Sequence, residues 1–573
     1  MVQMNADRVF INAKVYSVSL DGKETRAESV AIKDGKFAFV GSNEDAKKFI
    51  GENTVVTDCN GGSILPGFCD SHMHFAVSIR RFGVADLSDM VSDVANDTPE
   101  DILKEMQRRI VDFANSHPDD PVIHGSGWDR AWFEGTLGGR TYKLTRKDID
   151  AVIPDRPVAL DSACGHICLL NTKALEMAGI DKDFPNPPGG IIQRDEDGVP
   201  TGYVKETSAI RDVCDRIPGF EYTVEQQKNA LKASQDYFVS RGFTYLSDCM
   251  RQEIPYNIIK EMAENGELKV RVDGVFNCKD ATRDEDMEKA ISEKGKFDVA
   301  DIFKVDTVKY FIDENFAMME PYPKEFCEAM GLPEGAGTDE MLLWDLDHYR
   351  ESMEKAKKAG YNIHVHSYGD RAAHETIMAM VNARKANPDK RLKDIIAHIS
   401  FIKPEDENLM AEHGIIGAIQ PQWESANEID TASVMSNVGV DRFKGIFPNG
   451  SLARAGVILS NGSDFTVNLS NALEGITVAM TRKFPKNNKY YNDFKDVPAL
   501  NLDEVTTLKD SIQGWTINGA YQFGRDDITG SIEVGKSAEL VVLGGDIENT
   551  PVEDICLLEI KETVFKGQTT YKV

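Results

Sequence analysis

Residues 64–74 read ILPGFCDSHMH, an apolar run followed at once by a histidine pair at His72 and His74. On an extended chain, residues i and i+2 point to the same side, so both imidazoles can reach one cation. A histidine pair at this spacing also arises by chance, and by itself it is a weak indication of metal binding. The stretch predicts a strand that ends in two candidate ligands.

Seven further apolar runs of strand length follow, and amphipathic stretches fill most of the gaps, for example at 224–239, 339–359 and 371–386. This alternation is typical of βα units around a parallel sheet, and eight such units form a closed barrel. We therefore predict an α/β protein built on a TIM-like (β/α)8 barrel. Its strands are expected at 64–68, 243–247, 268–276, 305–312, 362–366, 395–399, 415–419 and 457–460.

Strand-like runs also occupy both ends of the chain. They lie at 9–11, 14–18, 29–32 and 37–40 near the start, and at 530–535, 538–543 and 563–565 near the finish. Neither end has enough strands to bury a face, because an isolated pair of strands is marginal in water. We expect residues 1–63 and 527–573 to form one composite β-sandwich domain, and residues 64–526 to form the barrel domain.

The segment at 76–241, between the first and the second predicted barrel strands, contains about 165 residues, far more than an ordinary connection holds. The insertion at 76–241 must therefore be structured. It contains a helical pattern at 99–114, a strand-like run at 158–160, and a hairpin turned by Asp197-Gly198, a favoured hairpin sequence. Because the insertion starts where the first barrel strand ends, we predict that it is a lid.

The charge balance excludes several classes of function. The chain of 573 residues has 94 Asp and Glu against 65 Lys and Arg, a net charge of −29. Such a surface repels phosphate backbones and anionic lipid, so we predict no nucleic-acid and no membrane partner. We expect a cytoplasmic protein, because the first residues lack the features of a signal peptide and no apolar run has membrane-spanning length. Nine cysteines are too few for a disulfide scaffold.

Polar side chains recur where the later strands end. His364 and His366 close the fifth predicted strand, His398 closes the sixth, and Asp464 follows the eighth. Catalytic groups of barrels project from this end of the strands. Each residue taken singly is more often a satisfied core histidine or a helix-capping aspartate. Taken together, so many polar groups crowded at one rim require a cation among them.

Lys309 lies within the fourth predicted strand. Barrel strands are covered on both faces, so an unpaired ammonium there costs several kcal/mol and favours the neutral amine. A neutral amine can add carbon dioxide to become a carbamate, whose two oxygens can bridge a pair of metals. The alternative is a side chain that extends to the rim and pairs with Asp313 or Glu314, and spacing alone favours it.

The order His-x-His, Lys, His, His, Asp along eight βα units resembles the amidohydrolase superfamily. Within it, the chain is similar to the N-substituted formamide deformylase-like and YtcJ-like proteins. The motifs that carry the resemblance span nearly the whole chain: LPGFCDSHMHF (65–75), GWD (127–129), PGGI (188–191), PTG (200–202), VKYF (308–311), HSYGDRA (366–372), QPQ (420–422), GSD (462–464) and GSIEVGKSAEL (530–540).

The resemblance implies two divalent metal ions, usually zinc, at the mouth of the barrel. His72, His74 and Asp464 would hold one ion, His366 and His398 the other, and carboxylated Lys309 would bridge them. His364 would be structural or lie behind the ligands. The chain departs from the family pattern in having Ala397 before His398, Trp423 after the QPQ motif, Glu314 after Asp313, and SACGH at 162–166. The metal-binding residues are present, so the reaction class carries over, but a relative's substrate does not.

The resemblance implies an enzyme that hydrolyses a carbon–nitrogen bond of an amide, N-acyl or N-formyl type in a small molecule. A hydroxide generated at the metals would attack, Asp464 would act as general base and then general acid, and His166 would help to hold the oxyanion. One alternative is other chemistry on the same scaffold: carbamate, lactam, cyclic imidate or ester hydrolysis, or decarboxylation. The other is a non-catalytic regulatory homologue, which the intact set of ligands weighs against.

Four further residues are candidates for substrate binding. The rings of Trp128 and Trp423 would contact an apolar or flat substituent of the substrate. Asp129 is a candidate because it matches the GWD motif together with Trp128, and Arg194 would pair with a substrate carboxylate. The alternatives are that the rings, with Trp132 and Phe133, form the core of the lid, and that Arg194 is an ordinary surface residue. The resemblance also implies a homodimer, since barrels of this family often form dimers.

Overall fold

The computed structural model describes residues 5–88, 90, 97–134, 140–163, 166–187, 190–314, 316–425, 434–488 and 491–573. The chain divides into two compact units. The first contains Met1–Ala76 and Gln235–Val573, and the second contains Val77–Ser234. The motif residues Cys164, Gly165, Pro188 and Gly189 lie outside the described residues.

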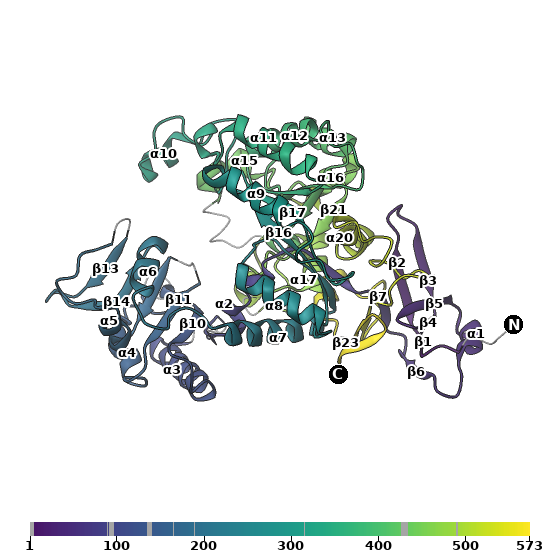
Figure 1. Ribbon diagram of the computed structural model, residues 1–573, viewed down its shortest axis with the longest axis horizontal. Coiled ribbons are helices and arrows are strands. Elements are labelled where there is room, and N and C mark those ends of the chain that lie inside the picture. Colours follow the sequence, from purple (N-terminus) through teal and green to yellow (C-terminus); the bar gives the residue numbers. More distant parts are fainter. Residues whose placement is uncertain are drawn as a thin grey trace. The chain divides into compact units, whose positions relative to one another are not determined.

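A parallel barrel sheet forms the centre of the first unit (Figure 1). Within the described residues it has eight strands, which neighbour one another in chain order. They are β8 (Phe68–Met73), β15 (Phe243–Asp248), β16 (Arg271–Asn277), β17 (Phe303–Phe311), β18 (Asn362–Ser367), β19 (Asp394–His398), β20 (Ile416–Ile419) and β21 (Leu459–Asn461). The predicted (β/α)8 barrel is confirmed.

The segment after β21 closes the barrel onto β8. The amide of Asp464 donates to the carbonyl of His72 at 2.8 Å, and the amide of His74 donates to the carbonyl of Phe465 at 2.6 Å. Gly462 has no space for a side chain, because a Cβ there would lie 2.6 Å from the His72 nitrogen. These two backbone hydrogen bonds and the close packing of Gly462 join the first and last strands of the barrel.

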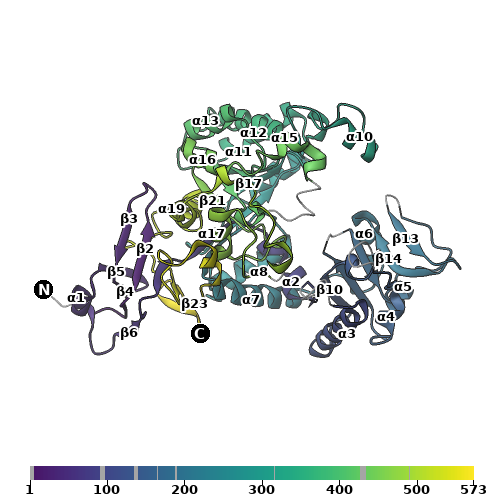
Figure 2. The ribbon, with the colours of Figure 1, turned by 180° about the vertical axis from the view of Figure 1, so that it is seen from behind.

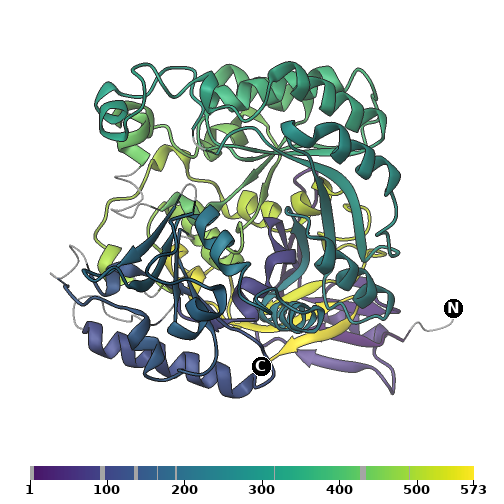
Figure 3. The same cartoon turned by 60° about the vertical axis from the view of Figure 1, so that its left-hand side comes forward.

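Helices cover the outside of the strands (Figure 3). Amphipathic patterns place their apolar faces inward, as in α11, where Tyr349, Met353 and Ala356 are buried at helical spacing. The helices of this unit include α8 (Glu253–Glu264), α9 (Arg283–Ser292), α11 (Leu346–Lys358), α12 (Asp370–Ala383), α13 (Pro404–His413), α16 (Asn449–Ala455), α17 (Ala472–Thr481), α19 (Leu508–Gly514) and α20 (Ile517–Gln522). Among the residues described, no helix has the length and apolar character that a membrane span requires.

The first predicted barrel strand, at 64–68, was wrong in its limits. Its residues divide between β7 (Ser63–Pro66), which pairs with strands from both ends of the chain, and β8 of the barrel. Gly67 separates the two strands, and it packs so closely that a Cβ would lie 2.2 Å from the Thr244 hydroxyl oxygen. One continuous apolar run therefore serves two sheets, which hydrophobicity alone does not reveal.

Strands from both ends of the chain lie side by side in Figures 1 and 2, purple beside yellow. One sheet has the order β24-β23-β22-β7-β2-β3 and another the order β5-β4-β1-β6. Buried side chains from both ends, among them Phe10, Val15 and Leu540, share one core. Their bounds are β1 (Arg8–Ile11), β2 (Lys14–Val18), β3 (Glu24–Ala27), β4 (Ser29–Lys33), β5 (Lys36–Gly41), β6 (Val55–Asp58), β22 (Leu540–Leu543), β23 (Ile560–Phe565) and β24 (Gln568–Lys572). Residues 530–535 form turns rather than the predicted strand.

The second unit contains a mixed sheet in the order β13-β14-β12-β11-β10-β9. Clusters of buried apolar side chains pack this unit. The predicted hairpin is confirmed as the antiparallel pair β13 and β14, and the helix predicted at 99–114 is α3. Bounds are β9 (Ala85–Asp86), β10 (Ile123–Trp128), β11 (Val158–Ser162), β12 (Ile167–Leu170), β13 (Ile191–Arg194), β14 (Pro200–Lys205), α3 (Pro99–Ser116), α4 (Arg146–Asp150), α5 (Thr172–Ala178) and α6 (Thr207–Cys214).

Candidate metal centre

The predicted ligands lie at or near the carboxyl ends of barrel strands. His72 is the last residue but one of β8, and His74 comes directly after this strand. Lys309 lies near the end of β17. The remaining three are His366 near the end of β18, His398 as the last residue of β19, and Asp464 just after β21. All are buried or half-buried. The topology therefore gathers these donors from five strands at one end of the barrel.

His72, His74 and Asp464 form a compact group. Oδ1 of Asp464 lies 2.9 Å from Nε2 of His74 and 3.5 Å from Nε2 of His72. The three donor atoms are close enough to one another to hold a single metal ion. The backbone of Asp464 has φ 56°, an uncommon conformation for a residue with a side chain and one that clusters at functional sites.

His366 and His398 adjoin this group. Their ring centroids are 4.4 Å apart, and the ring of His398 is 4.8 Å from that of His72. Nδ1 of His398 donates to Oε1 of Gln420 at 2.8 Å, which leaves Nε2 free to bind a metal. Trp423 stacks on His398, with centroids 5.2 Å apart and planes 3° from parallel. Gln420 and Trp423 thus fix the orientation of this imidazole.

Burial determines the protonation state of these rings. It lowers the pKa of His72, His366 and His398 well below the usual value for histidine, and the neighbouring cationic groups lower it further. The imidazoles are therefore neutral, which is the form that binds a metal ion.

Lys309 is fully buried, and burial lowers the pKa of its amine to about 8. Within the part of the chain that the structure describes, Nζ has no hydrogen-bond partner. Pairing with Asp313 is ruled out, because that carboxylate accepts the amides of Ala317, Tyr368 and Gly369, and no ion pair links it to Lys309 among the described residues. The amine instead lies 5.0 Å from the ring centre of Phe311.

The residues present fit a divalent metal. Nζ of Lys309, Nε2 of His366 and Nδ1 of His74 are buried and have no hydrogen-bond partner among the residues described. Each unsatisfied polar atom of this kind costs about 1–3 kcal/mol. Neutral imidazoles beside a carboxylate are donors that zinc prefers. A bound cation would therefore satisfy a group of atoms that the protein alone leaves unsatisfied.

Comparison with known proteins supports the same conclusion. Residues 55–571 match the model of the amidohydrolase family. The chain belongs to the amidohydrolase family. Its similarity extends to YtcJ of Bacillus subtilis (strain 168), which is named as an amidohydrolase. The two are 26% identical over 566 residues, covering 97% of this chain and 98% of the relative.

Two more similarities cover nearly all of this amidohydrolase family member. An N-substituted formamide deformylase of Arthrobacter pascens is 23% identical over 593 residues, covering 100% of this chain and 99% of the relative. A solved structure from Pyrococcus furiosus, described as an uncharacterized metal-dependent hydrolase, has a TM-score of 0.70 at 21% identity, covering 94% of this chain and 99% of that one. The latter similarity establishes the fold.

The substrate residues predicted in the insertion make contacts within the second unit of this amidohydrolase. Trp128 is fully buried in an apolar core, and its indole donates to the carbonyl of Leu160 at 2.9 Å. Asp129 accepts the amide of Ala131. His166 is exposed and lies 3.2 Å from Glu206, and Arg194 donates to the carbonyls of Phe184 and Ile192. Their roles in catalysis and substrate binding stay predictions.

Sequence reasoning did not identify Cys249 or the part played by Gln420. Cys249 directly follows β15, so its position after the second barrel strand was a usable signal. Gln420 follows β20 within the QPQ motif, where an amide can accept a hydrogen bond from a ligand histidine. His364 was expected behind the ligands, and its Nε2 lies 2.9 Å from Nδ1 of His72.

Proposed function

We propose that this member of the amidohydrolase family is a metal-dependent hydrolase that cleaves the carbon–nitrogen bond of a small-molecule amide. One observation carries the proposal: the fully buried amine of Lys309 has no hydrogen-bond partner among the described residues and lies among neutral imidazoles and a carboxylate. Those donors fit two divalent ions, for which zinc is the leading candidate. His72, His74 and Asp464 would hold one ion, and His366 and His398 the other.

Lys309 would bridge the two ions as a carbamate. Its pKa of about 8 leaves about a tenth of the amine neutral at pH 7, far more than an ordinary lysine has. Nζ would attack the carbon of carbon dioxide, forming a C–N bond as one C–O π bond opens onto oxygen, and one proton would pass to solvent. The product would have a single negative charge shared by two oxygens, which are ligands that a divalent ion accepts. It also replaces an unfavourable buried ammonium by an anion among cations.

The ions, when bound, would polarise a carbonyl and lower the pKa of a water molecule. The chain's own part is proton transfer and orientation. Oδ1 of Asp464 lies beside Nε2 of both His72 and His74. As the carboxylate of this group, it could accept a proton from the attacking water and deliver it to the departing nitrogen. Gln420 and Trp423 hold His398 in one orientation, which fixes the site before substrate binds.

The relatives support an amide or formamide as the substrate class. Two of them are named as an amidohydrolase and as an N-substituted formamide deformylase. Ala397 and Trp423 stand where the family pattern has other residues. The nitrogen substituent that a relative prefers therefore does not carry over to this chain. Carbamate, lactam, cyclic imidate or ester hydrolysis and decarboxylation are the alternatives on the same scaffold, and a non-catalytic regulatory homologue is the alternative without catalysis.

Metal quantification on the purified protein, joined to a substrate screen, tests the proposal. The panel pairs N-formyl and N-acyl derivatives of aromatic amines with the matching esters and carbamates. We expect about two metal ions for each chain, release of the amine from at least one amide, and loss of activity with a chelator that zinc restores. Turnover of esters or carbamates alone would favour the first alternative. A protein that binds no metal and turns over nothing would favour the regulatory alternative.

A further inference from the structure

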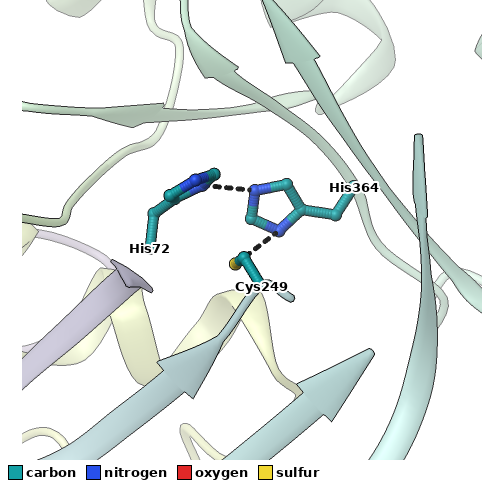
Figure 4. A group of neighbouring side chains, drawn as sticks. All are labelled: His72, Cys249 and His364. Carbon is teal, nitrogen blue, oxygen red and sulfur yellow. Dashed lines mark hydrogen bonds between the residues drawn. The ribbon is translucent and has the colours of Figure 1, made fainter. Parts of the chain in front are cut away.

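Behind the proposed ligand His72 lies a row of buried side chains (Figure 4). Nδ1 of His72 is 2.9 Å from Nε2 of His364, and Nδ1 of His364 is 3.9 Å from Sγ of Cys249. Sγ of Cys249 is in turn 3.5 Å from the hydroxyl of Ser247. His364, Cys249 and Ser247 are fully buried. The family motif HSYGDRA begins only at His366, so it assigns no role to this row.

The direction of the hydrogen bonds follows from the ring that must bind metal. Nε2 of His72 faces Oδ1 of Asp464, so a metal held by this pair takes Nε2. The proton of a neutral His72 then resides on Nδ1, which must donate, and Nε2 of His364 must accept. His364 consequently has its own proton on Nδ1, directed at the sulfur of Cys249, and the thiol can donate to Ser247. From His72 to Cys249, each donor in the row thus meets an acceptor.

We propose that His364 is a positioning residue, which accepts the Nδ1 proton of His72 and thereby presents Nε2 of His72 to the metal, with Cys249 supporting His364 from behind. This inference rests on the proposed metal centre. The same molecule contains a parallel, since Nδ1 of His398 donates to Oε1 of Gln420 at 2.8 Å. Two ligand histidines are therefore oriented in the same way, one by an amide oxygen and one by a second imidazole.

The three residues His72, Cys249 and His364 also have donor atoms close enough to suggest a metal site of their own. The arrangement of His364 argues against it. Nε2 of His364 faces His72 and its Nδ1 faces Cys249, so neither nitrogen faces both of the other residues. A single ion held by all three would need one His364 nitrogen directed between the other two ligands.

Matched substitutions of His364 test the proposal. Gln retains an acceptor near the place of Nε2, whereas Asn retains one only near the place of Nδ1. Zinc affinity, measured by competition with a chelator, should fall about 10–100-fold in His364→Asn, the loss found when the partner of a ligand histidine is removed. His364→Gln should stay close to the parent. Cys249→Ala should lose less affinity than His364→Asn.

Several results would overturn the inference. Equal affinities in His364→Gln and His364→Asn would show that the acceptor does not matter, and thermal unfolding of the metal-free variants separates this from misfolding. A sulfur-to-cobalt charge-transfer band in the cobalt-loaded parent, absent in Cys249→Ala, would make Cys249 a ligand. A metal-loaded crystal structure of the parent with Nδ1 of His72 bound to metal would also contradict it. A parent that binds no metal would instead disprove the proposed function, and this inference with it.

Discussion

Charged side chains are buried at both ends of the same barrel strands, and the two ends differ in whether the buried charge has a partner of opposite charge. β19 begins at Asp394, which pairs with Lys357 at 2.7 Å and with Arg384. β16 begins at Arg271, which pairs with Glu539 and Asp301, each at 2.7 Å. At the carboxyl ends, by contrast, Lys309 and His366 have buried nitrogens without a hydrogen-bond partner in the described part of the chain.

This difference separates structural charges from functional ones. Buried ions are tolerated when each has an opposite charge and further hydrogen bonds, as at the amino ends. A buried amine without a partner lowers stability, so it persists only where another interaction offsets the cost. At the carboxyl ends that interaction would be a bound cation. Four substitutions test whether the two ends behave as differently as this comparison requires.

The largest effect is expected at the carboxyl end, for Asp464→Asn. The amide keeps an oxygen that can bind metal but cannot accept the proton of water. We expect kcat for an amide substrate to fall about 10²–10⁴-fold, the usual contribution of general acid–base catalysis, while bound metal stays measurable. Steady-state kinetics and metal analysis on the same preparation check this. Parent-level kcat in the metal-loaded variant would remove Asp464 from the proton transfer.

At the amino end, Arg271→Met should affect stability and leave catalysis alone. It removes the cationic partner of buried Glu539, which retains the hydroxyls of Thr529 and Ser537. Breaking a buried ion pair in this way costs about 3–5 kcal/mol. The denaturation midpoint should fall accordingly, whereas kcat per bound metal should equal that of the parent. A reduced kcat at unchanged stability would mean that the two ends are not separate in function.

Lys309→Met should do the opposite and stabilise the metal-free protein. Burial lowers the pKa of Lys309 from 10.5 to about 8 in the folded state. The free-energy cost of burying the ammonium is therefore complete below pH 8, and it disappears as the pH rises to 10.5. Because each pKa unit corresponds to about 1.4 kcal/mol, the variant should gain about 3 kcal/mol at pH 7 when carbon dioxide is excluded.

The matched control is Lys357→Met, which removes a buried lysine that has a partner. It leaves Asp394 with Arg384 alone, so it should destabilise at pH 7. Denaturant unfolding of both variants at pH 7 and near pH 10 gives the comparison. A Lys309→Met protein no more stable than the parent at pH 7 would show that the amine is satisfied in solution.

The polar residues at the carboxyl ends could largely be predicted from the sequence, whereas the ion pairs at Arg271 and Asp394 were not predicted. The spacing of apolar runs located the barrel strands, and the ends of those runs identified His72, His398 and Asp464 as candidates. Sequence could not show that the run at 64–68 serves two sheets, because that depends on the close packing of Gly67 against Thr244.

The two-residue alternation of side chains along a strand could not distinguish the roles of His364 and His366 either, because residues two apart face the same side. The family motif assigned the ligand role to His366, and the structure shows in addition that the two residues differ in burial. His364 is fully buried against His72, whereas His366 is half-buried nearer the end of the strand. Depth along a strand depends on the tilt and register of its neighbours, which one chain's residue pattern does not encode.

The smallest effect is expected for Trp423, and it distinguishes two roles. If the ring only supports His398, Trp423→Leu removes a stacking contact worth about 0.5–1.5 kcal/mol, so zinc affinity should fall about 2–10-fold with KM unchanged. If it contacts substrate, as the sequence predicts, KM should rise with zinc affinity unchanged. Trp423→Phe retains a ring, and it should restore zinc affinity in the first case. We expect the first pattern, because the indole lies flat on His398. A variant identical to the parent in both measurements would contradict both roles.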